Sequence, residues 1–244
     1  MPRVFNLKLL MALAIFGILA LAQGTAQADP ISVCTGVGCS QQNVTGTIVA
    51  GNGTVTITLN NNLTNAQVQD VSQNISAVYF QVSGYNGGAV TLGANSSTAS
   101  VTVGAGGSAT SGGAQNPTGW GAGNGGNIVT VCVICAFGVV SPEGPDRTII
   151  GGDATNPYPG ANGSIAANGP HNPFLAGTVT FVLNVPGVTT ESTFSNVVIQ
   201  FGTTASAPDE VIVGQEVPEP ASMLLLGTGL IGVAAGARRR FGKK

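Results

Sequence analysis

Four cysteines stand in two close pairs, and thiols at such spacings can do three kinds of chemistry. Cys34 and Cys39 bound a short Gly-containing loop, and Cys132 and Cys135 form a Cys-x-x-Cys motif. A redox role is disfavoured because no βαβ pattern surrounds the motif and no nearby cation would lower a thiol pKa. A zinc site made of all four thiolates fits the spacing only loosely. For an exported chain, the favoured pairing among three connectivities is two local disulfides, Cys34–Cys39 and Cys132–Cys135.

Acid–base chemistry has few candidates in this sequence. His171 is the only histidine, and no nucleophile or orienting partner accompanies it in sequence. The acidic residues considered for hydrolysis are scattered: Asp146, Asp153, Asp209 and Glu210. Because paired carboxylates are brought together in space rather than in sequence, an extracellular hydrolase stays open as an alternative. We expect no enzyme activity, no cofactor and no metal site, with a calcium site at Asp153 as a weaker alternative.

Two kinds of surface recognition are also considered. The aromatic residues Trp120, Tyr85 and Tyr158 lie in polar, Gly-rich segments, so we expect them on exposed loops where they can stack on sugar rings. The alternation Thr54-x-Thr56-x-Thr58 places threonines on one face of a strand, and Thr178 and Thr180 repeat the pattern once. An ice-binding surface is therefore a further alternative, and it requires a flat array of threonines on adjacent strands.

The elements that must position these residues are β-strands. Val55, Ile57 and Leu59 alternate with threonines, and period-two alternation is typical of a half-buried strand. A hairpin is predicted at Gly51-Asn52-Gly53. About eight strands between turn signals favour an all-β, antiparallel β-sandwich of jelly-roll type with long Gly-, Asn- and Pro-rich loops. The stretches 104–126 and 151–173 are predicted to be loops.

The N-terminus has the pattern of a secretory signal peptide. Arg3 and Lys8 precede or enter an apolar core, which is followed by the small-x-small triplet from Ala26 to Ala28. We predict a signal helix within residues 1–28 and cleavage by signal peptidase after Ala28.

The C-terminus carries a second apolar segment with a different arrangement. Val217, Pro218, Glu219 and Pro220 lead into an apolar run over 221–237, and Arg238, Arg239 and Arg240 follow at once in the basic tail 238–244. The run has the length of a short transmembrane helix, and the positive charges after it stay on the cytoplasmic side. The tail resembles the PEP-CTERM sorting signal of Gram-negative bacteria. This resemblance implies an exosortase as processing partner, transient residence in the inner membrane, and delivery to the cell surface or extracellular matrix.

Between these ends the sequence predicts a β-sandwich domain over 29–202 and a polar spacer over 203–216, followed by the sorting signal 217–244. Of the eight basic residues, only Arg147 lies in residues 29–216, beside nine of the ten acids. A body with one cation cannot neutralise a phosphate backbone, so nucleic-acid binding is excluded. We expect a non-catalytic structural, adhesive or carbohydrate-binding module. Association with exopolysaccharide and biofilm is implied by the PEP-CTERM resemblance.

Overall fold

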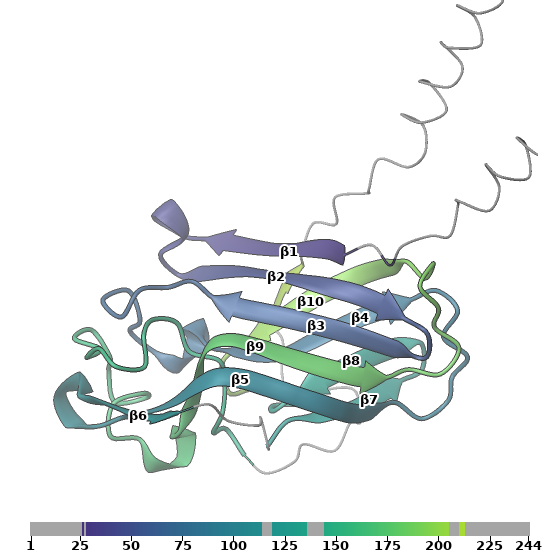
Figure 1. Ribbon diagram of the computed structural model, residues 1–244. Coiled ribbons are helices and arrows are strands. Elements are labelled where there is room, and N and C mark those ends of the chain that lie inside the picture. The colour runs from purple at the N-terminus through teal and green to yellow at the C-terminus, as the bar shows by residue number, and fades with distance from the viewer. Residues whose placement is uncertain (1–25, 27, 114–118, 136–143, 205–209, 213–244) are drawn as a thin grey trace, which may run out of the picture. The chain divides into compact units, whose positions relative to one another are not determined.

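The computed structural model describes residues 26, 28–113, 119–135, 144–204 and 210–212. In this part of the chain, two antiparallel β-sheets lie one on the other (Figure 1). No helix within these residues is long and apolar enough to cross a membrane. The predicted signal helix and the predicted membrane helix over 221–237 lie outside the described residues.

The first sheet has six strands in the order β1-β2-β3-β9-β5-β6. All of its neighbouring strands pair antiparallel. The strands are β1 (Ala28–Thr35), β2 (Gln42–Gly51), β3 (Thr54–Asn61), β9 (Phe174–Asn184), β5 (Thr91–Val103) and β6 (Ala109–Gly113).

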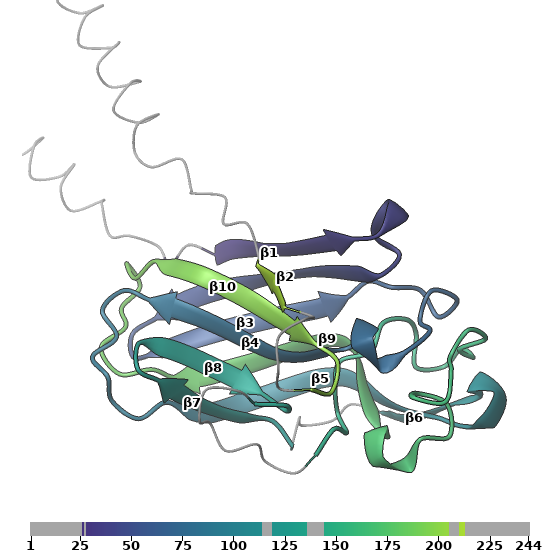
Figure 2. The same ribbon diagram turned by 180° about the vertical axis from the view of Figure 1, so that it is seen from behind.

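The second sheet has five strands in the order β11-β10-β4-β8-β7, and it faces the viewer in Figure 2. Its strand pairs are also antiparallel. The strands are β11 (Glu210–Ile212), β10 (Phe194–Phe201), β4 (Ile75–Val82), β8 (Ile128–Cys132) and β7 (Gly121–Gly125). The remaining elements are the short 3-10 helices η1 (Val37–Cys39), η2 (Val71–Gln73), η3 (Ala105–Gly107) and η4 (Gly169–His171).

The main core lies between the two sheets and follows directly from strand alternation. In β3, Val55, Ile57 and Leu59 are buried while the threonines between them are half-buried, as the period-two pattern predicts. Phe181 of β9 contributes a fully buried ring to the same core from the neighbouring strand. The opposite sheet contributes the buried residues Val78 and Phe80 of β4, Val129 and Val131 of β8, and Phe194 and Ile199 of β10.

The predicted hairpin is confirmed. Gly51 pairs with Thr54, so Asn52 and Gly53 form a two-residue loop between β2 and β3. Gly53 has φ of 72°, a conformation that glycine adopts without strain and that short hairpin turns require.

The strand order differs from that of a jelly roll. Strands β1, β2 and β3 follow one another in one sheet as a meander, whereas a jelly roll is built from two Greek keys. The all-β antiparallel class is confirmed, but the jelly-roll detail is not supported. Turn signals mark where strands end, but they carry no information on which sheet the next strand joins.

Two segments that we expected to be irregular contain strands. The Gly-rich stretch 104–126 includes β6 and β7, and the predicted spacer 203–216 includes β11, which pairs with β10. All three are edge strands, paired on one side to a stronger strand. A ladder of backbone hydrogen bonds needs no side chains, so even the sequence Gly-Ala-Gly-Asn-Gly of β7 can join a sheet.

Candidate functional site

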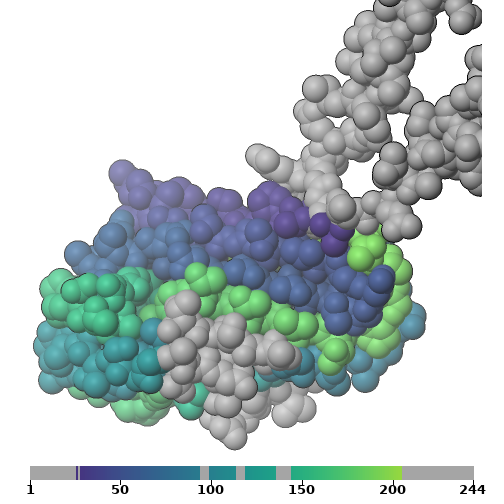
Figure 3. All heavy atoms as spheres, viewed as in Figure 1, coloured from purple at the N-terminus to yellow at the C-terminus, as the bar shows by residue number. Residues whose placement is uncertain are grey.

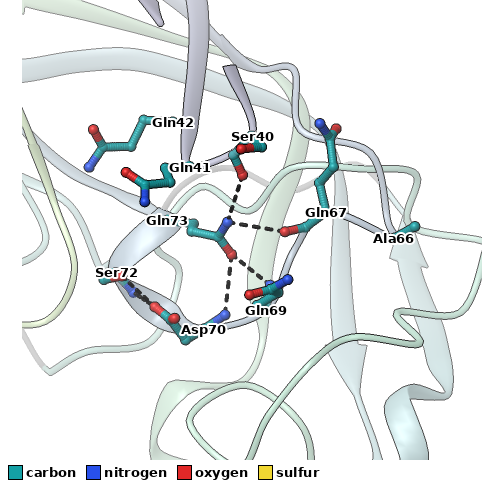
Figure 4. A pocket seen from close by; sticks show the side chains of 9 residues that line it. All are labelled: Ser40, Gln41, Gln42, Ala66, Gln67, Gln69, Asp70, Ser72 and Gln73. Atoms are coloured by element: carbon teal, nitrogen blue, oxygen red, sulfur yellow. Dashed lines mark hydrogen bonds between the residues drawn. The ribbon is translucent and has the colours of Figure 1, made fainter. Parts of the chain in front are cut away.

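A hollow of about 520 Å³ is lined mainly by amide side chains (Figure 4). One wall is the connection from η1 into β2, and the other is the segment that leads into η2. Five glutamines and one carboxylate dominate the lining: Gln41, Gln42, Gln67, Gln69, Gln73 and Asp70. We refer to this hollow as the amide pocket.

Gln73 fixes the geometry of the amide pocket, since its side chain is 7% exposed and makes four hydrogen bonds. Its Nε2 donates to the backbone carbonyls of Ser40 (3.3 Å) and Gln67 (3.0 Å). Its Oε1 accepts from the backbone N–H groups of Gln69 (2.6 Å) and Asp70 (3.2 Å). The contact with Ser40 crosses to the opposite wall (Figure 4), so one amide holds both walls in register.

Asp70 is the cap of η2 rather than a free charge. Its carboxylate accepts hydrogen bonds from the backbone N–H of Ser72 (2.9 Å) and from the hydroxyl of Ser72. Together with Gln73 this forms a capping box, in which cap and third residue satisfy each other's backbone N–H groups. The single acidic residue of the pocket is therefore already engaged in local structure.

Other amides in the pocket keep unused hydrogen-bonding capacity. Gln41 and Gln69 are exposed, and neither side chain has a hydrogen-bond partner within the described part of the chain. The Oε1 atoms of Gln42 and Gln67 accept from Thr35 Oγ1 and from Thr64 respectively, both at 2.9 Å, which leaves their NH₂ groups as donors. The pocket thus offers neutral amide donors and acceptors beside one carboxylate that already accepts hydrogen bonds, which suits a neutral, hydroxyl-bearing ligand.

Both predicted disulfides are present. Cys34 and Cys39, with Cα atoms 4.6 Å apart, close the loop that ends where the first wall of the amide pocket begins. Cys132 and Cys135, 5.2 Å apart, join the end of β8 to the residues after it. All four sulfurs are paired in these two bonds, so the thiolate zinc site is not formed.

The expectation that the aromatic residues are exposed for sugar stacking is wrong for Trp120 and Tyr158. Trp120 is 4% exposed, its ring lies 4.6 Å from that of Phe181, and its Nε1 donates to the carbonyl of Arg147 (2.8 Å). Tyr158 is 0% exposed and belongs to a second apolar cluster with Phe174. Large aromatic rings gain most from burial, and this body has few other side chains of that size.

Tyr85 is the exception, because it is half-buried. Its hydroxyl donates to the carbonyl of Gly88 (2.6 Å), and its ring packs on the edge of the main core. It lines a smaller hollow of about 250 Å³ with Gln81 and Ser195. Burial raises the pKa of Tyr85. Burial and, to a smaller extent, the charge of Asp153 raise the pKa of Tyr158.

Comparison with protein families decides the nature of the C-terminal tail. A family described as the PEP-CTERM protein-sorting motif matches residues 216–240. The chain carries a PEP-CTERM sorting motif. It is therefore an exported protein that an exosortase sorts to the cell surface. No curated protein and no solved structure matches the chain.

The PEP-CTERM motif covers every residue that we assigned to the sorting box and to the arginine cluster. These residues, Val217, Pro218, Glu219, Pro220, Arg238, Arg239 and Arg240, lie outside the described residues. The compact unit that contains both sheets ends at Gly214, just before the motif begins. At the other end, Ala26 is exposed, and Ala28 begins β1. Signal-peptide cleavage after Ala28 stays a prediction.

Two of the side chains weighed for catalysis, His171 and Asp153, make local hydrogen bonds. Nδ1 of His171 lies 2.5 Å from the carbonyl oxygen of Ser164; a carbonyl only accepts, so Nδ1 carries the proton. The carboxylate of Asp153 accepts from the backbone N–H and the hydroxyl of Thr155 (2.8 Å each) and from Asn156 Nδ2 (3.0 Å). These hydrogen bonds, first among them the backbone N–H of Thr155, lower the pKa of Asp153.

Metal ligands do not gather in the described part of the chain. Within those residues, no three His, Cys, Asp or Glu side chains come together in a way that could hold a metal ion. Oδ2 of Asp146 lies 3.4 Å from Nε of Arg147, the one basic residue in the stretch 29–216. Asp209 and the side chain of Glu210 lie outside the described part of the structure.

The amide pocket itself was missed by sequence reasoning. The sequence places Gln41, Gln69 and Gln73 in polar stretches, and the stretch 67–75 predicts no more than a loop or a weak helical turn. No known binding motif consists of glutamines at such positions. The one local signal was the spacing Asp70-x-x-Gln73, which is the sequence signature of a capping box and marks where a helical turn begins.

Proposed function

We propose that this exported chain is a non-catalytic module of the cell surface or extracellular matrix that binds neutral polysaccharide in the amide pocket. The observation that carries the proposal is the pair of exposed amides of Gln41 and Gln69, which have no hydrogen-bond partner among the described residues, beside the fixed amide of Gln73. Polar groups that line one hollow can orient a ligand by hydrogen bonds.

Charge supports a neutral ligand. Arg147 is the one basic side chain in residues 29–216, and Asp146 pairs with it. Anionic polymers would meet a body rich in acids, so electrostatics disfavours nucleic acid and acidic glycans alike.

The local engagement of Asp70 and Asp153 supports a binding role over hydrolysis. A general base must be free to reach the proton that it abstracts, and these two carboxylates accept hydrogen bonds from backbone N–H and neighbouring hydroxyl groups. The signal peptide belongs to the same proposal, on the basis of the N-terminal pattern from Arg3 to Ala28. The transient inner-membrane step and a role in an exopolysaccharide-rich biofilm belong to it on the basis of the PEP-CTERM motif.

A glycan array and a polysaccharide pull-down with the exported protein test the proposal. Wild type is expected to be retained by at least one neutral polysaccharide, and Gln41→Ala/Gln69→Ala is expected to lose that retention. Gln81→Ala, which removes an amide from β4 outside the pocket, is the matched control and should bind as wild type does. Thermal melts confirm that all three proteins fold. Absence of retention on every neutral glycan, or equal retention of the double variant, would reject the pocket as a glycan site.

A further inference from the structure

The outer face of the six-stranded sheet carries an array of threonines. On β2, β3 and β9 the residues that alternate with the buried ones point away from the core, and most of them are threonine. Figure 3 looks onto this face. We define the threonine face by seven residues on three adjacent strands: Thr45, Thr47, Thr54, Thr56, Thr58, Thr178 and Thr180.

Strand register orders these threonines in two dimensions. Thr58 pairs with Thr47 on one side and with Thr180 on the other, so three threonines form a row across the sheet. The next row along the strands contains Thr45, Asn60 and Thr178. On the other side of Thr58, the row contains Val49, Thr56 and Val182. Outward residues recur about every 6.6–6.8 Å along a strand, and neighbouring strands lie about 4.7–4.9 Å apart, so the outward side chains of these rows lie on a grid with these spacings.

Side-chain hydrogen bonds hold parts of the grid in place. The hydroxyls of Thr58 and Thr180 are 3.3 Å apart across β3 and β9. Asn62 Nδ2 donates to the hydroxyl of Thr45 at 2.9 Å. β-Branched side chains are already stiff at χ1, so the array loses little further freedom when it meets a partner.

The side chains of the threonine face limit which partners it can bind. Its outward positions on β2, β3 and β9 carry no charged and no aromatic side chain. A partner must therefore be neutral and periodic, hydrogen-bond to hydroxyls and tolerate methyl groups. Sugar rings gain from aromatic platforms, which are missing here, whereas a water lattice needs none.

We propose that the threonine face binds the surface of ice, with hydroxyls joining the water lattice and methyl groups resting between its waters. This activity lies beyond the proposed glycan binding and uses none of the residues of the amide pocket. Export places such a surface where extracellular ice forms, and the near-absence of cations keeps the face free of strongly hydrated ammonium groups.

Partition of the exported protein into slowly grown ice tests the inference, together with microscopy of ice-crystal growth. Wild type is expected to be enriched in the ice fraction and to slow crystal growth. Thr56→Tyr, which raises a ring between Val49 and Val182 in the row beside that of Thr58, should abolish both effects, and Thr56→Val, which keeps the shape but removes a hydroxyl, should weaken them. Ser195→Tyr, at an exposed position on β10 of the other sheet, is the matched control and should behave as wild type.

Three outcomes overturn the inference. The inference is wrong if wild type is excluded from ice. It is also wrong if Thr56→Tyr partitions into ice as wild type does while a thermal melt shows that the variant is folded. The third such outcome is that wild type does not bind ice but binds crystalline cellulose or chitin, and that Thr56→Tyr loses this binding. The last result would assign the face to an ordered glycan. Because Gln41→Ala/Gln69→Ala leaves the threonine face intact, its ice partition separates failure of this inference from failure of the pocket.

Discussion

Two regions of this protein are held together by different means. Between the sheets, apolar side chains such as Phe181 and Ile57 are fully buried and make the main core. In the loops, carboxamide side chains hold neighbouring segments together by hydrogen bonds to their backbone groups. Asn172, for instance, donates through Nδ2 to the carbonyls of Asn168 (2.8 Å) and Ile165 (3.2 Å) and accepts from the N–H of Val103 (2.7 Å).

The contrast shows how a nearly cation-free body orders long loops. Asn65 donates to the carbonyls of Asp153 (2.9 Å) and Asn156 (2.8 Å). In the amide pocket, Gln73 donates two hydrogen bonds to carbonyls and accepts two from backbone N–H groups. A carboxamide offers donors and acceptor in one neutral group, so it can satisfy backbone groups without a counterion. Apolar burial should nevertheless dominate stability, and four predictions test that ranking from the largest effect to the smallest.

Phe181→Ala should have the largest effect. Removing the ring leaves a cavity against Trp120, and such changes cost about 3–5 kcal/mol in unfolding free energy. Urea denaturation followed by the emission of Trp120, the single tryptophan, measures this loss and should show a red-shifted native spectrum. Val182→Ala, at the half-buried neighbouring position that points outward, is the control and should lose about 1 kcal/mol or less. Equal losses for the two variants would contradict the assigned core.

Gln73→Leu should come next. The change keeps the side-chain size but leaves two backbone N–H and two carbonyl groups without their partner, which costs about 2–3 kcal/mol. Denaturant unfolding measures the loss. Gln41→Leu removes an unpartnered amide from the same pocket and should stay within about 0.5 kcal/mol of wild type. If Gln73→Leu lowered the unfolding free energy as much as Phe181→Ala does, the expected ranking of the core above the loops would be wrong.

The disulfides should have a moderate effect. Cys34 and Cys39 are five residues apart, and closing so short a loop restricts the unfolded chain by only about 2 kcal/mol. Cys34→Ser/Cys39→Ser is therefore expected to fold and to melt a few degrees lower in a calorimeter. The reduced wild type serves as comparison. Complete unfolding of the double variant would show that the bond maintains more than its own loop.

The pH dependence of Asp153 should be the smallest effect. Its folded-state pKa lies below the ordinary value of 3.8, so its contribution is present above that pH and is lost as the pH falls through the folded-state pKa. Asp29 acts in the opposite sense, since partial burial raises its pKa, and protonation favours the folded state in that window. The unfolding free energies of Asp153→Asn and wild type, measured between pH 7 and pH 2, should therefore become equal on the acid side of this range. A constant difference between Asp153→Asn and wild type at all pH values would contradict a role for ionised Asp153.

Much of the architecture could be predicted from local signals. Alternation located β3, Asn52-Gly53 located a hairpin, and the close Cys pairs indicated both disulfides, because each signal is contained within a few neighbouring residues. The sorting motif was equally readable, since its box, apolar run and arginines act as a linear signal. Edge strands β6, β7 and β11 were missed because their stability comes from the strand beside them and not from their own sequence.

The sequence by itself determined the C-terminal sorting motif, the all-β class, the inward and outward faces of the best strands and the shortage of cations. Only the tertiary structure decided that Trp120 and Tyr158 are buried, that Gln73 joins two distant segments into a pocket, and that Thr47, Thr58 and Thr180 form one row. The physical reason is that burial and register are properties of pairs of segments. Thr47 and Thr180 come to lie on either side of Thr58 by strand pairing, and no pattern within either segment records its partner.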